Sequence, residues 1–249
     1  MKRLFVVLLS LAFVLSLSCC DYETDILKSE KMVAVKYASA NENAAEEYIK
    51  GGYKKVTYNS SSDVVIAVEN KKADIGILDD FELNSLCGDR NILSQSTCEY
   101  SIDYCAYFNS EDTELKKSFD KAIVALEEAG TLEKIKDAHL KVEDYKPSKK
   151  NPTEKALVML CDPSFDNRIY TDKNGDIVGL DVDIAQEICN YLGYDIEFVV
   201  ADTDELFIEL DDGTGDFILS ALEVNEQREK YYLSSTPYFT LNFHTIVRK

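Results

Sequence analysis

Short apolar runs alternate with segments of helical periodicity along most of the chain. The runs Met32–Lys36 and Asp74–Leu78 are typical of buried strands, while Glu42–Lys50 and Ser62–Asn70 show the spacing of helices. Further strands are expected at Lys54–Tyr58 and Tyr100–Phe108, and further helices at Asp80–Leu86, Thr113–Ala129 and Leu132–Leu140. Because strands and helices alternate at this spacing, the pattern predicts an α/β fold with a mostly parallel sheet and helices on both faces.

A polar stretch with two prolines, Val142–Pro152, has no periodicity and indicates a linker. A second α/β series then begins with the apolar run Ala156–Cys161. The turn Lys173–Asp176 contains Asn-Gly between apolar pairs, which is typical of a hairpin; it lacks the glycine and glutamate positions of an EF-hand calcium loop. The other expected elements are helices at Asp183–Leu192, Asp204–Leu210 and Asn225–Lys230 and strands at Ile196–Val200, Asp216–Leu219 and Phe243–Arg248.

The N-terminus has the pattern of an export signal. A short basic segment precedes Leu4–Leu17, an uncharged and mostly apolar run that is shorter than the ~20 residues of a membrane-spanning helix. A small residue, Ser18, ends this segment, and polar residues follow the cysteine pair behind it. We therefore expect a removable leader over residues 1–18.

A cysteine directly after the cleavage position resembles a bacterial lipoprotein signal, in which the thiol carries a lipid. This resemblance implies a tether over residues 19–30, anchored to the membrane through Cys19, with the protein at the cell surface or in the periplasm. Two alternatives stay open. Cys20 is the lipidated residue in one, and in the other the protein is secreted without an anchor.

Composition and charge exclude several classes of function. The 249 residues include 27 Lys and Arg against 46 Asp and Glu, a formal net charge of −19, which argues against binding to nucleic-acid phosphates. Only two histidines occur, His139 and His244, and there is no Cys-x-x-Cys pair. A zinc site, a redox motif or a Ser/His/Asp triad is therefore not expected, nor is any cofactor.

Five of the seven cysteines lie in the body of the chain, and an odd number leaves at least one thiol free. Cys105, Cys161 and Cys189 lie within apolar patterns and are expected to pack as small hydrophobic residues. Cys87 and Cys98 flank a polar loop, and export would permit a disulfide between them. Whether this bridge forms is left open.

Several spaced motifs resemble extracytoplasmic solute-binding proteins of the polar amino-acid family, which serve ABC importers. The segment DPSFDNRIYTDKNGDIVGLDVDIAQEICNYLGYDIEFV (Asp162–Val199) resembles the family's first lobe, and DFILSALEVNEQREKYYLSSTPYF continues it. VAVKYASANENAAEEYI and KKADIGILDD resemble parts of the second lobe, and Ser118–His139 resembles the closing helices. The resemblance covers roughly residues 31–142 and 155–249 and implies a two-lobed type II periplasmic-binding-protein fold.

The order of these motifs is permuted relative to the family. Lobe 2 comes first (31–104), followed by a closing strand and helices that return to lobe 1 (105–142), a linker (143–154) and lobe 1 itself (155–249). Circular permutation is tolerated where the old termini lie close together and the new ends are exposed. One covalent hinge is then expected near Tyr100–Tyr104, and with it a larger opening amplitude than in unpermuted relatives.

The resemblance implies a ligand site built on opposite charges. A free amino acid calls for a guanidinium fork facing its carboxylate and a carboxylate facing its ammonium group. The family's arginine falls on Arg228, and its ammonium-binding aspartate falls on Asp79, at a strand end. Lys36 falls where glutamine-binding relatives carry a lysine that reaches the ligand. Ser39 and Asn41 fall where the family has small hydroxyl residues and helix N-terminal amides.

Other positions keep or change the family's pattern. Asp162 opens the first motif and is expected to accept a hydrogen bond from the ligand side chain, and Phe165 keeps an aromatic ring that clamps the ligand. Arg168 and Thr203, in contrast, replace ring-bearing positions. The family's Ser-Gly-Met-Thr segment corresponds here to Ser220, Ala221, Leu222 and Glu223.

A charge at Glu223 would repel the ligand carboxylate unless Arg168 or Arg228 neutralises it. A polar or charged ligand is therefore expected, and a degenerate site that binds nothing is the alternative. Simple structural roles also stay open, as a helix N-cap for Asp79, as a turn cap for Asp162 and as a solvated surface charge for Arg228.

These observations predict a monomeric, non-enzymatic lipoprotein that captures a polar amino acid by lobe closure and delivers it to an ABC permease in the membrane. One alternative is an orphan or sensory binding module without its own permease. Another is a dehydratase-type enzyme on the same fold, for which Glu223 or Asp162 would serve as the general acid. The pair of Arg228 and Asp79 favours the binding role.

Overall fold

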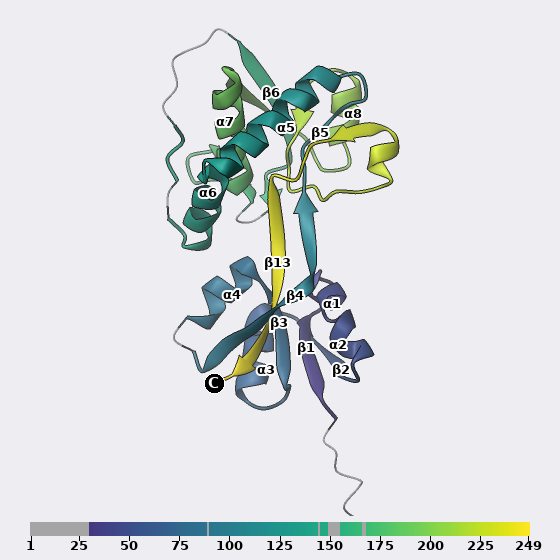
Figure 1. The fold of residues 1–249 in the computed structure, drawn as a ribbon, viewed down its shortest axis with the longest axis vertical. Coiled ribbons are helices and arrows are strands. Elements are labelled where there is room, and N and C mark those ends of the chain that lie inside the picture. Colours follow the sequence, from purple (N-terminus) through teal and green to yellow (C-terminus); the bar gives the residue numbers. More distant parts are fainter. Residues whose placement is uncertain (1–29, 89, 144, 149–154, 166–167) are drawn as a thin grey trace, which may run out of the picture.

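Two α/β lobes, joined by a pair of antiparallel strands, make up the chain (Figure 1). The computed structural model describes residues 30–249 except 89, 144, 149–154 and 166–167. From here on we number the lobes by chain order: the first lobe, at the bottom of Figure 1, is lobe 2 of the family's order, and it contains the first elements of the chain and also its last strand. The predicted two-lobed α/β fold is confirmed.

The first lobe is built on a five-stranded sheet of order β2-β1-β3-β13-β4. Its strands are β1 (Met32–Lys36), β2 (Lys54–Tyr58), β3 (Ile75–Asp79), β4 (Ile92–Tyr104) and β13 (Phe239–Arg248), and its helices are α1 (Asn41–Ala44), α2 (Glu46–Lys50), α3 (Ser61–Glu69) and α4 (Asp80–Cys87). Successive side chains of a strand point to opposite faces, so Val33 packs with Ala44 and Ala45 beside α1, while Ala34 packs with Val64 of α3. Helices therefore cover both faces of this sheet.

The second lobe has a sheet of order β10-β6-β11-β5-β12 and a small three-stranded sheet, β7-β8-β9. The predicted Asn-Gly turn connects β8 to β9. The strands are β5 (Tyr107–Asn109), β6 (Ala156–Cys161), β7 (Ser164–Phe165), β8 (Ile169–Thr171), β9 (Ile177–Val178), β10 (Asp195–Val200), β11 (Phe217–Ile218) and β12 (Tyr232–Ser234). The helices are α5 (Thr113–Glu128), α6 (Thr131–Leu140), α7 (Leu180–Leu192), α8 (Leu206–Asp211) and a 3-10 turn at Arg228–Lys230.

Two long strands, β4 and β13, cross between the lobes (Figure 1). They pair in antiparallel register from Phe239 opposite Tyr104 to Arg248 opposite Ile92, and β13 also pairs with β3. The expectation of one crossing near Tyr100–Tyr104 is therefore wrong, because the C-terminal strand returns to the sheet of the first lobe and forms a second crossing. The predicted increase in opening amplitude loses its basis.

The same return changes two other expectations. Residues 239–248 pair within the sheet of the first lobe, so they do not lie with the rest of the segment 155–249. The sheets are mixed rather than mostly parallel, because β13 runs antiparallel to β3 and β5 runs antiparallel to β11. The parallel strands of each sheet point towards the other lobe. β5 and β13 come from that other lobe, so they run through their sheet in the opposite direction.

Several local predictions are changed in detail. The expected helix Glu42–Lys50 is divided into α1 and α2 at Ala45, and the expected helix Asn225–Lys230 is only a 3-10 turn. The expected strand Tyr100–Phe108 is divided between β4 and β5, since its halves belong to different lobes. The five described cysteines are buried and none forms a disulfide, so the bridge between Cys87 and Cys98 that was left open above is absent from the structure.

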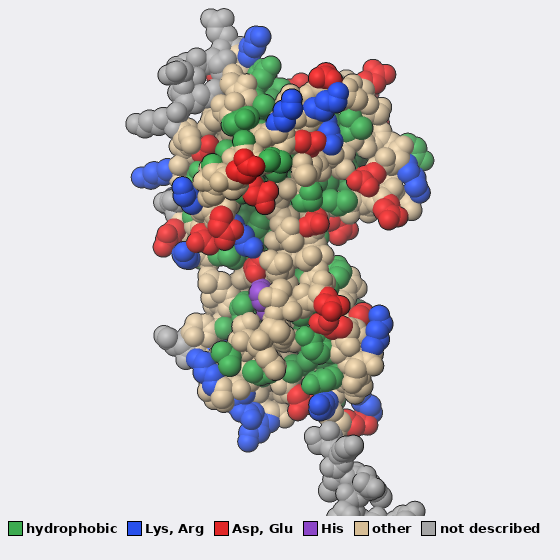
Figure 2. All heavy atoms as spheres, viewed as in Figure 1, with side chains coloured by type: hydrophobic (Ala, Val, Ile, Leu, Met, Phe, Trp, Pro, Cys, Tyr) green, Lys and Arg blue, Asp and Glu red, His purple; other side chains and the backbone are tan. Residues whose placement is uncertain are grey.

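The expected leader and Cys19, the expected lipidation site, lie outside the described residues, as does part of the linker. None of the described helices combines the length and the apolar character needed to cross a membrane. On the face drawn in Figure 2, acidic and basic side chains are interspersed over both lobes, with a narrower waist where the lobes join. This face therefore carries no continuous basic patch.

Candidate functional site

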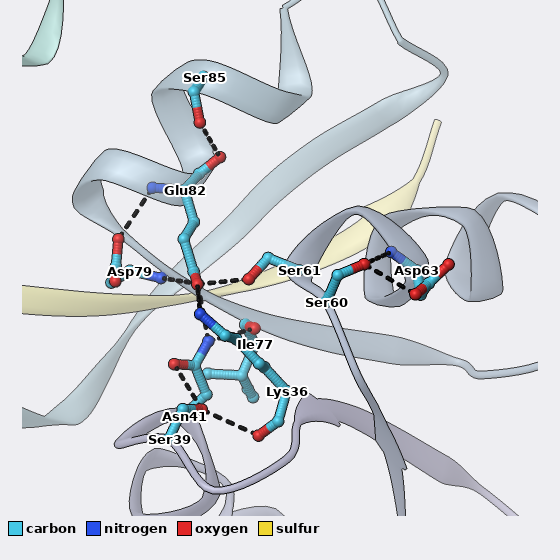
Figure 3. A network of polar contacts seen from close by, with 10 residues as sticks. All are labelled: Lys36, Ser39, Asn41, Ser60, Ser61, Asp63, Ile77, Asp79, Glu82 and Ser85. Carbon is cyan, nitrogen blue, oxygen red and sulfur yellow. Dashed lines mark hydrogen bonds and ion pairs between the residues drawn. The ribbon is translucent and has the colours of Figure 1, made fainter. Parts of the chain in front are cut away.

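The candidate residues of the first lobe lie at the carboxyl ends of neighbouring parallel strands (Figure 3). Lys36 is the last residue of β1, and Asp79 is the last residue of β3. In open α/β sheets, ligands bind at this edge of the sheet. Ser39 and Asn41 follow β1 in the turn that enters α1. The structure thus brings together four of the predicted residues, which we call the first half-site.

Hydrogen bonds within the protein hold the turn after β1. Ser39 Oγ donates to the carbonyl oxygen of Lys36 at 2.9 Å and contacts Asn41 Oδ1 at 3.2 Å. Asn41 is buried, and its Nδ2 donates to the carbonyl oxygen of Ile77 at 2.9 Å and to Glu82 Oε2 at 2.8 Å. Ser39 and Asn41 therefore shape the half-site in this structure, because their side chains already have partners.

Glu82, a residue absent from the prediction, joins the members of this half-site. Its Oε1 lies 3.7 Å from Lys36 Nζ and accepts a hydrogen bond from Ser61 Oγ. Its Oε2 accepts from Asn41 Nδ2 and, at 3.2 Å, from the backbone N–H of Asp79. In return Glu82 N–H donates to Asp79 Oδ1 at 2.8 Å, which completes a capping box on α4. The pattern Asp-x-x-Glu at a helix start was the sequence signal for this residue.

The pKa values of Asp79, in the first half-site, and of its neighbour Asp80 are shifted in opposite directions. Burial raises the pKa of Asp79 to about 6, and the nearby charge of Glu82 adds to the effect. Burial also acts on Asp80, but hydrogen bonds from His244 and Asn242 and the charge of Lys136 outweigh it and hold the pKa of Asp80 at about 2. Asp79 is the N-cap of α4, which is the structural role left open for it above. None of the described cationic side chains forms an ion pair with Asp79.

The candidate residues of the second lobe also follow parallel strands. Asp162 follows β6 directly, and its backbone N–H donates to Ser220 Oγ, just after β11, at 2.9 Å. The Asp162 carboxylate accepts from Thr203 N–H at 3.0 Å, from Thr203 Oγ1 at 2.6 Å and from Ser164 N–H at 3.1 Å. These bonds tie the loops after β6 and β10 together, which is the turn-capping alternative for Asp162.

Arg168 lies buried against Asp181. Its Nε and Nη2 donate to Asp181 Oδ1 at 2.9 and 2.7 Å. The guanidinium group lies over the rings of Tyr104 and Phe239, at 4.0 and 4.7 Å from their centroids. These rings belong to β4 and β13, so the side chain is fixed where the crossing strands enter the second lobe. Arg168 is one of the two arginines that could neutralise the charge of Glu223, and in the structure its own charge is instead balanced by Asp181.

Ala221 is bound to the same carboxylate. Its backbone N–H donates to Asp181 Oδ2 at 2.6 Å, and its φ of +50° lies in the left-handed region that favours glycine. Phe165 lies in β7 and packs, partly buried, against the main hydrophobic core. Ala221 therefore adopts the backbone shape that the family's glycine would favour, and Phe165 is anchored within its own lobe.

Arg228 is placed differently from Arg168. Its Nη1 donates to the carbonyl oxygen of Glu223 at 3.4 Å, and its guanidinium lies 5.8 and 5.5 Å from the ring centroids of Tyr107 and Phe207. The side chain is half-buried, and none of the described carboxylates forms an ion pair with it. Glu223 is exposed. The charge of Arg228 is therefore available to an anionic group.

We call Asp162, Ser220, Ala221, Glu223 and Arg228 the second half-site. No hydrogen bond or ion pair connects it to the first half-site among the described residues. Within the same part of the chain, no group of His, Cys, Asp and Glu side chains is arranged to hold a metal ion. The arrangement offers an uncompensated guanidinium on one lobe and an uncompensated carboxylate on the other, which is chemically suited to a zwitterion.

The C-terminal part of the chain matches a known family. Residues 157–249 match the sequence model of the bacterial extracellular solute-binding proteins, family 3. This segment begins in β6 and ends with β13, and it includes the whole second half-site. The predicted resemblance to polar amino-acid solute-binding proteins is therefore confirmed by a family match over residues 157–249.

Individual relatives match over limited lengths. An arginine-binding periplasmic protein of Mannheimia haemolytica is 32% identical over 92 residues, which cover 37% of this chain and 39% of the relative. A membrane-bound lytic murein transglycosylase F of Enterobacter sp. (strain 638) is 31% identical over 80 residues, 32% of this chain and 16% of the relative. The chain thus spans well under half the length of these relatives.

Among solved structures, the arginine-bound form of domain 1 from TmArgBP is 33% identical and has a TM-score of 0.34, with 38% of this chain and 80% of that chain covered. This TM-score is too low to relate the two structures as wholes.

Proposed function

We propose that this chain is an exported binding protein that captures a polar amino acid, or a similar small zwitterion, between its two lobes for import by an ABC permease. The observation that carries the proposal is the charge arrangement of the two half-sites. Arg228 has no carboxylate partner, Asp79 has no cationic partner among the described residues, and the two side chains belong to different lobes. Closure of the lobes on a ligand would satisfy both charges with one molecule.

The ligand class follows from charge and from a relative. A zwitterion presents a carboxylate for Arg228 and an ammonium group for Asp79. The name of the Mannheimia haemolytica relative makes arginine the first ligand to test. The transglycosylase relatives share only 16% of their length with this chain, so we propose binding without catalysis.

We further propose the permuted order of the lobes, the export signal and the lipid anchor at Cys19. The permuted order is supported by the position of the family match, which begins only at residue 157, while β1–β3 and α1–α4 precede it as a separate lobe. The proposal of a permease partner rests on the family and on the pattern of the leader. Copurification of the protein with membranes, lost in Cys19→Ser, would test the anchor.

Titration calorimetry of the purified protein against the twenty amino acids tests the ligand. Arg228→Met and Asp79→Asn should each weaken binding by about a hundredfold, because a desolvated charge on the ligand loses its partner. Asparagine keeps the N-cap of α4, so Asp79→Asn should fold normally. Arg248→Met, at an exposed position of β13, and Asp137→Asn, at a half-buried position of α6 where the aspartate pairs with Lys141, are the matched controls. Absence of binding to every amino acid by folded protein would contradict the proposed function.

A further inference from the structure

Lys36 and Asp79 stand at the ends of neighbouring parallel strands, yet Lys36 pairs with a different carboxylate. Its Nζ lies 3.7 Å from Glu82 Oε1, and no ion pair joins it to Asp79. A lysine ammonium on a flexible stem takes whichever carboxylate within reach offers the better interaction. Glu82 therefore competes with Asp79 for Lys36 and holds it.

The carboxylate of Glu82 is fixed in place by neutral donors. Ser61 Oγ of α3 donates to Oε1, and Asn41 Nδ2 and the backbone N–H of Asp79 donate to Oε2 (Figure 3). The Glu82 side chain is 16% exposed, against 42% for that of Lys36. Glu82 is thus the immobile member of the ion pair, and Lys36 is the mobile member.

We propose, on the basis of the function proposed above, that Glu82 is a positioning residue that holds Lys36 away from Asp79 and so keeps the Asp79 carboxylate free for the ammonium group of the ligand. Two carboxylates and one ammonium give these three side chains a net charge of −1. The half-site then attracts a cationic group before the ligand arrives. Lys36 acts as the partner of Glu82 and is not itself a ligand contact.

Among the described residues, no other cation around Asp79 replaces this role. Asp80, the next residue of α4, is occupied by His244 of β13 and by Lys136 of α6. Asp79 also pairs in the sheet with Phe243 of β13, an apolar neighbour. Burial and the charge of Glu82 raise the pKa of Asp79 to about 6, so binding of an ammonium group should weaken as the pH falls through about 6.

The test compares Glu82→Gln, Lys36→Met and the double variant in calorimetry of an amino acid that the wild type binds. Glutamine keeps an acceptor for the capping box but loses the charge that holds Lys36. We expect about tenfold weaker binding in Glu82→Gln, and recovery to within about threefold of the wild type when Lys36→Met is added. A purely structural role for Glu82 would not be rescued by removing Lys36. Glu69→Gln, on α3 and paired with Arg90, is the matched control.

A second measurement is independent of any ligand. NMR titration of the Asp79 carboxyl should show its pKa lowered in Glu82→Gln, where Lys36 is released to it, and higher again in the double variant. Equal Asp79 pKa values in the single and double variants would overturn the inference, as would a double variant that binds no better than Glu82→Gln. Those results leave the proposed function standing if the wild type binds. If the wild type bound no amino acid but the Asp79 pKa changed as expected in the variants, the proposed function would be contradicted and the role of Glu82 would not.

Discussion

Lys136 Nζ lies 3.1 Å from Asp80 Oδ2, and this ion pair connects α6 of the second lobe with α4 of the first. Asp80 also accepts a hydrogen bond from His244 Nε2 at 2.7 Å, which ties the pair to the crossing strand β13. The two charged side chains are only 21% and 12% exposed. The lobes are therefore held by the paired strands and, in addition, by a shielded electrostatic contact beside them.

Removing the cation of this contact should loosen the lobes. In Lys136→Met, we expect a loss of about 1 kcal/mol in the free energy of unfolding, because Asp80 keeps its other partners. Small-angle scattering should show a larger radius of gyration without ligand. Lys134→Met, an exposed neighbour on α6, should leave both quantities unchanged. Equal behaviour of the two variants would show that the ion pair does not restrain the lobes.

Acid should weaken the same contact. The pKa of Asp80 is about 2 in the folded protein, against about 4 for an unperturbed aspartate, so its ionised form stabilises the fold. That contribution is fully present above about pH 4 and is lost as the pH falls from about 4 to about 2. Urea unfolding at a series of pH values should show that the free energy of unfolding falls less over this range in Asp80→Asn than in the wild type. Parallel curves would contradict the assignment.

The buried pair of Arg168 and Asp181 should be the most sensitive electrostatic position. Arg168→Met leaves Asp181, which is fully buried, without its cation, and we expect a loss of about 3 kcal/mol or more in the free energy of unfolding. Replacing Asp181 by Asn in the same chain should recover part of this loss, because it removes the unpaired charge. Chemical unfolding of the single and double variants measures the coupling, and additive losses would argue against a direct pair.

Two alanines adopt a backbone conformation that favours glycine, one beside the first half-site and one within the second. Ala38 has φ of +51° and Ala221 has φ of +50°. Left-handed backbone costs alanine roughly 1–2 kcal/mol, and glycine loses roughly 0.5–1 kcal/mol more in chain entropy on folding. Ala38→Gly and Ala221→Gly should therefore raise the free energy of unfolding by about 0.5 kcal/mol each. Ala138→Gly, within α6, should lower it by about 1 kcal/mol, and thermal unfolding distinguishes these signs.

Much of the architecture could be predicted from the sequence because the relevant signals are local. Alternating apolar runs identified β1, β2, β3 and β6 to within a residue, and Asn174-Gly175 identified the hairpin between β8 and β9. The motif positions of Lys36, Asp79, Ser39 and Asn41 also led to residues that the structure brings to one edge of a sheet. A strand end or a turn is specified by its own residues, so no knowledge of distant neighbours was needed.

The partners of charged side chains could not be predicted in the same way. Arg168 pairs with Asp181, Asp162 accepts a hydrogen bond from Thr203, and Lys36 pairs with Glu82. The partners in each pair are separated in the sequence, and only the tertiary fold brings them close in space. The return of β13 to the first lobe depends on its pairing with β3 and β4, not on its own composition. The sequence by itself determined the elements and the residues at their ends. Tertiary structure decided which charged side chains form ion pairs with each other and which stay unpaired for a ligand, because ion pairing depends on which elements become neighbours.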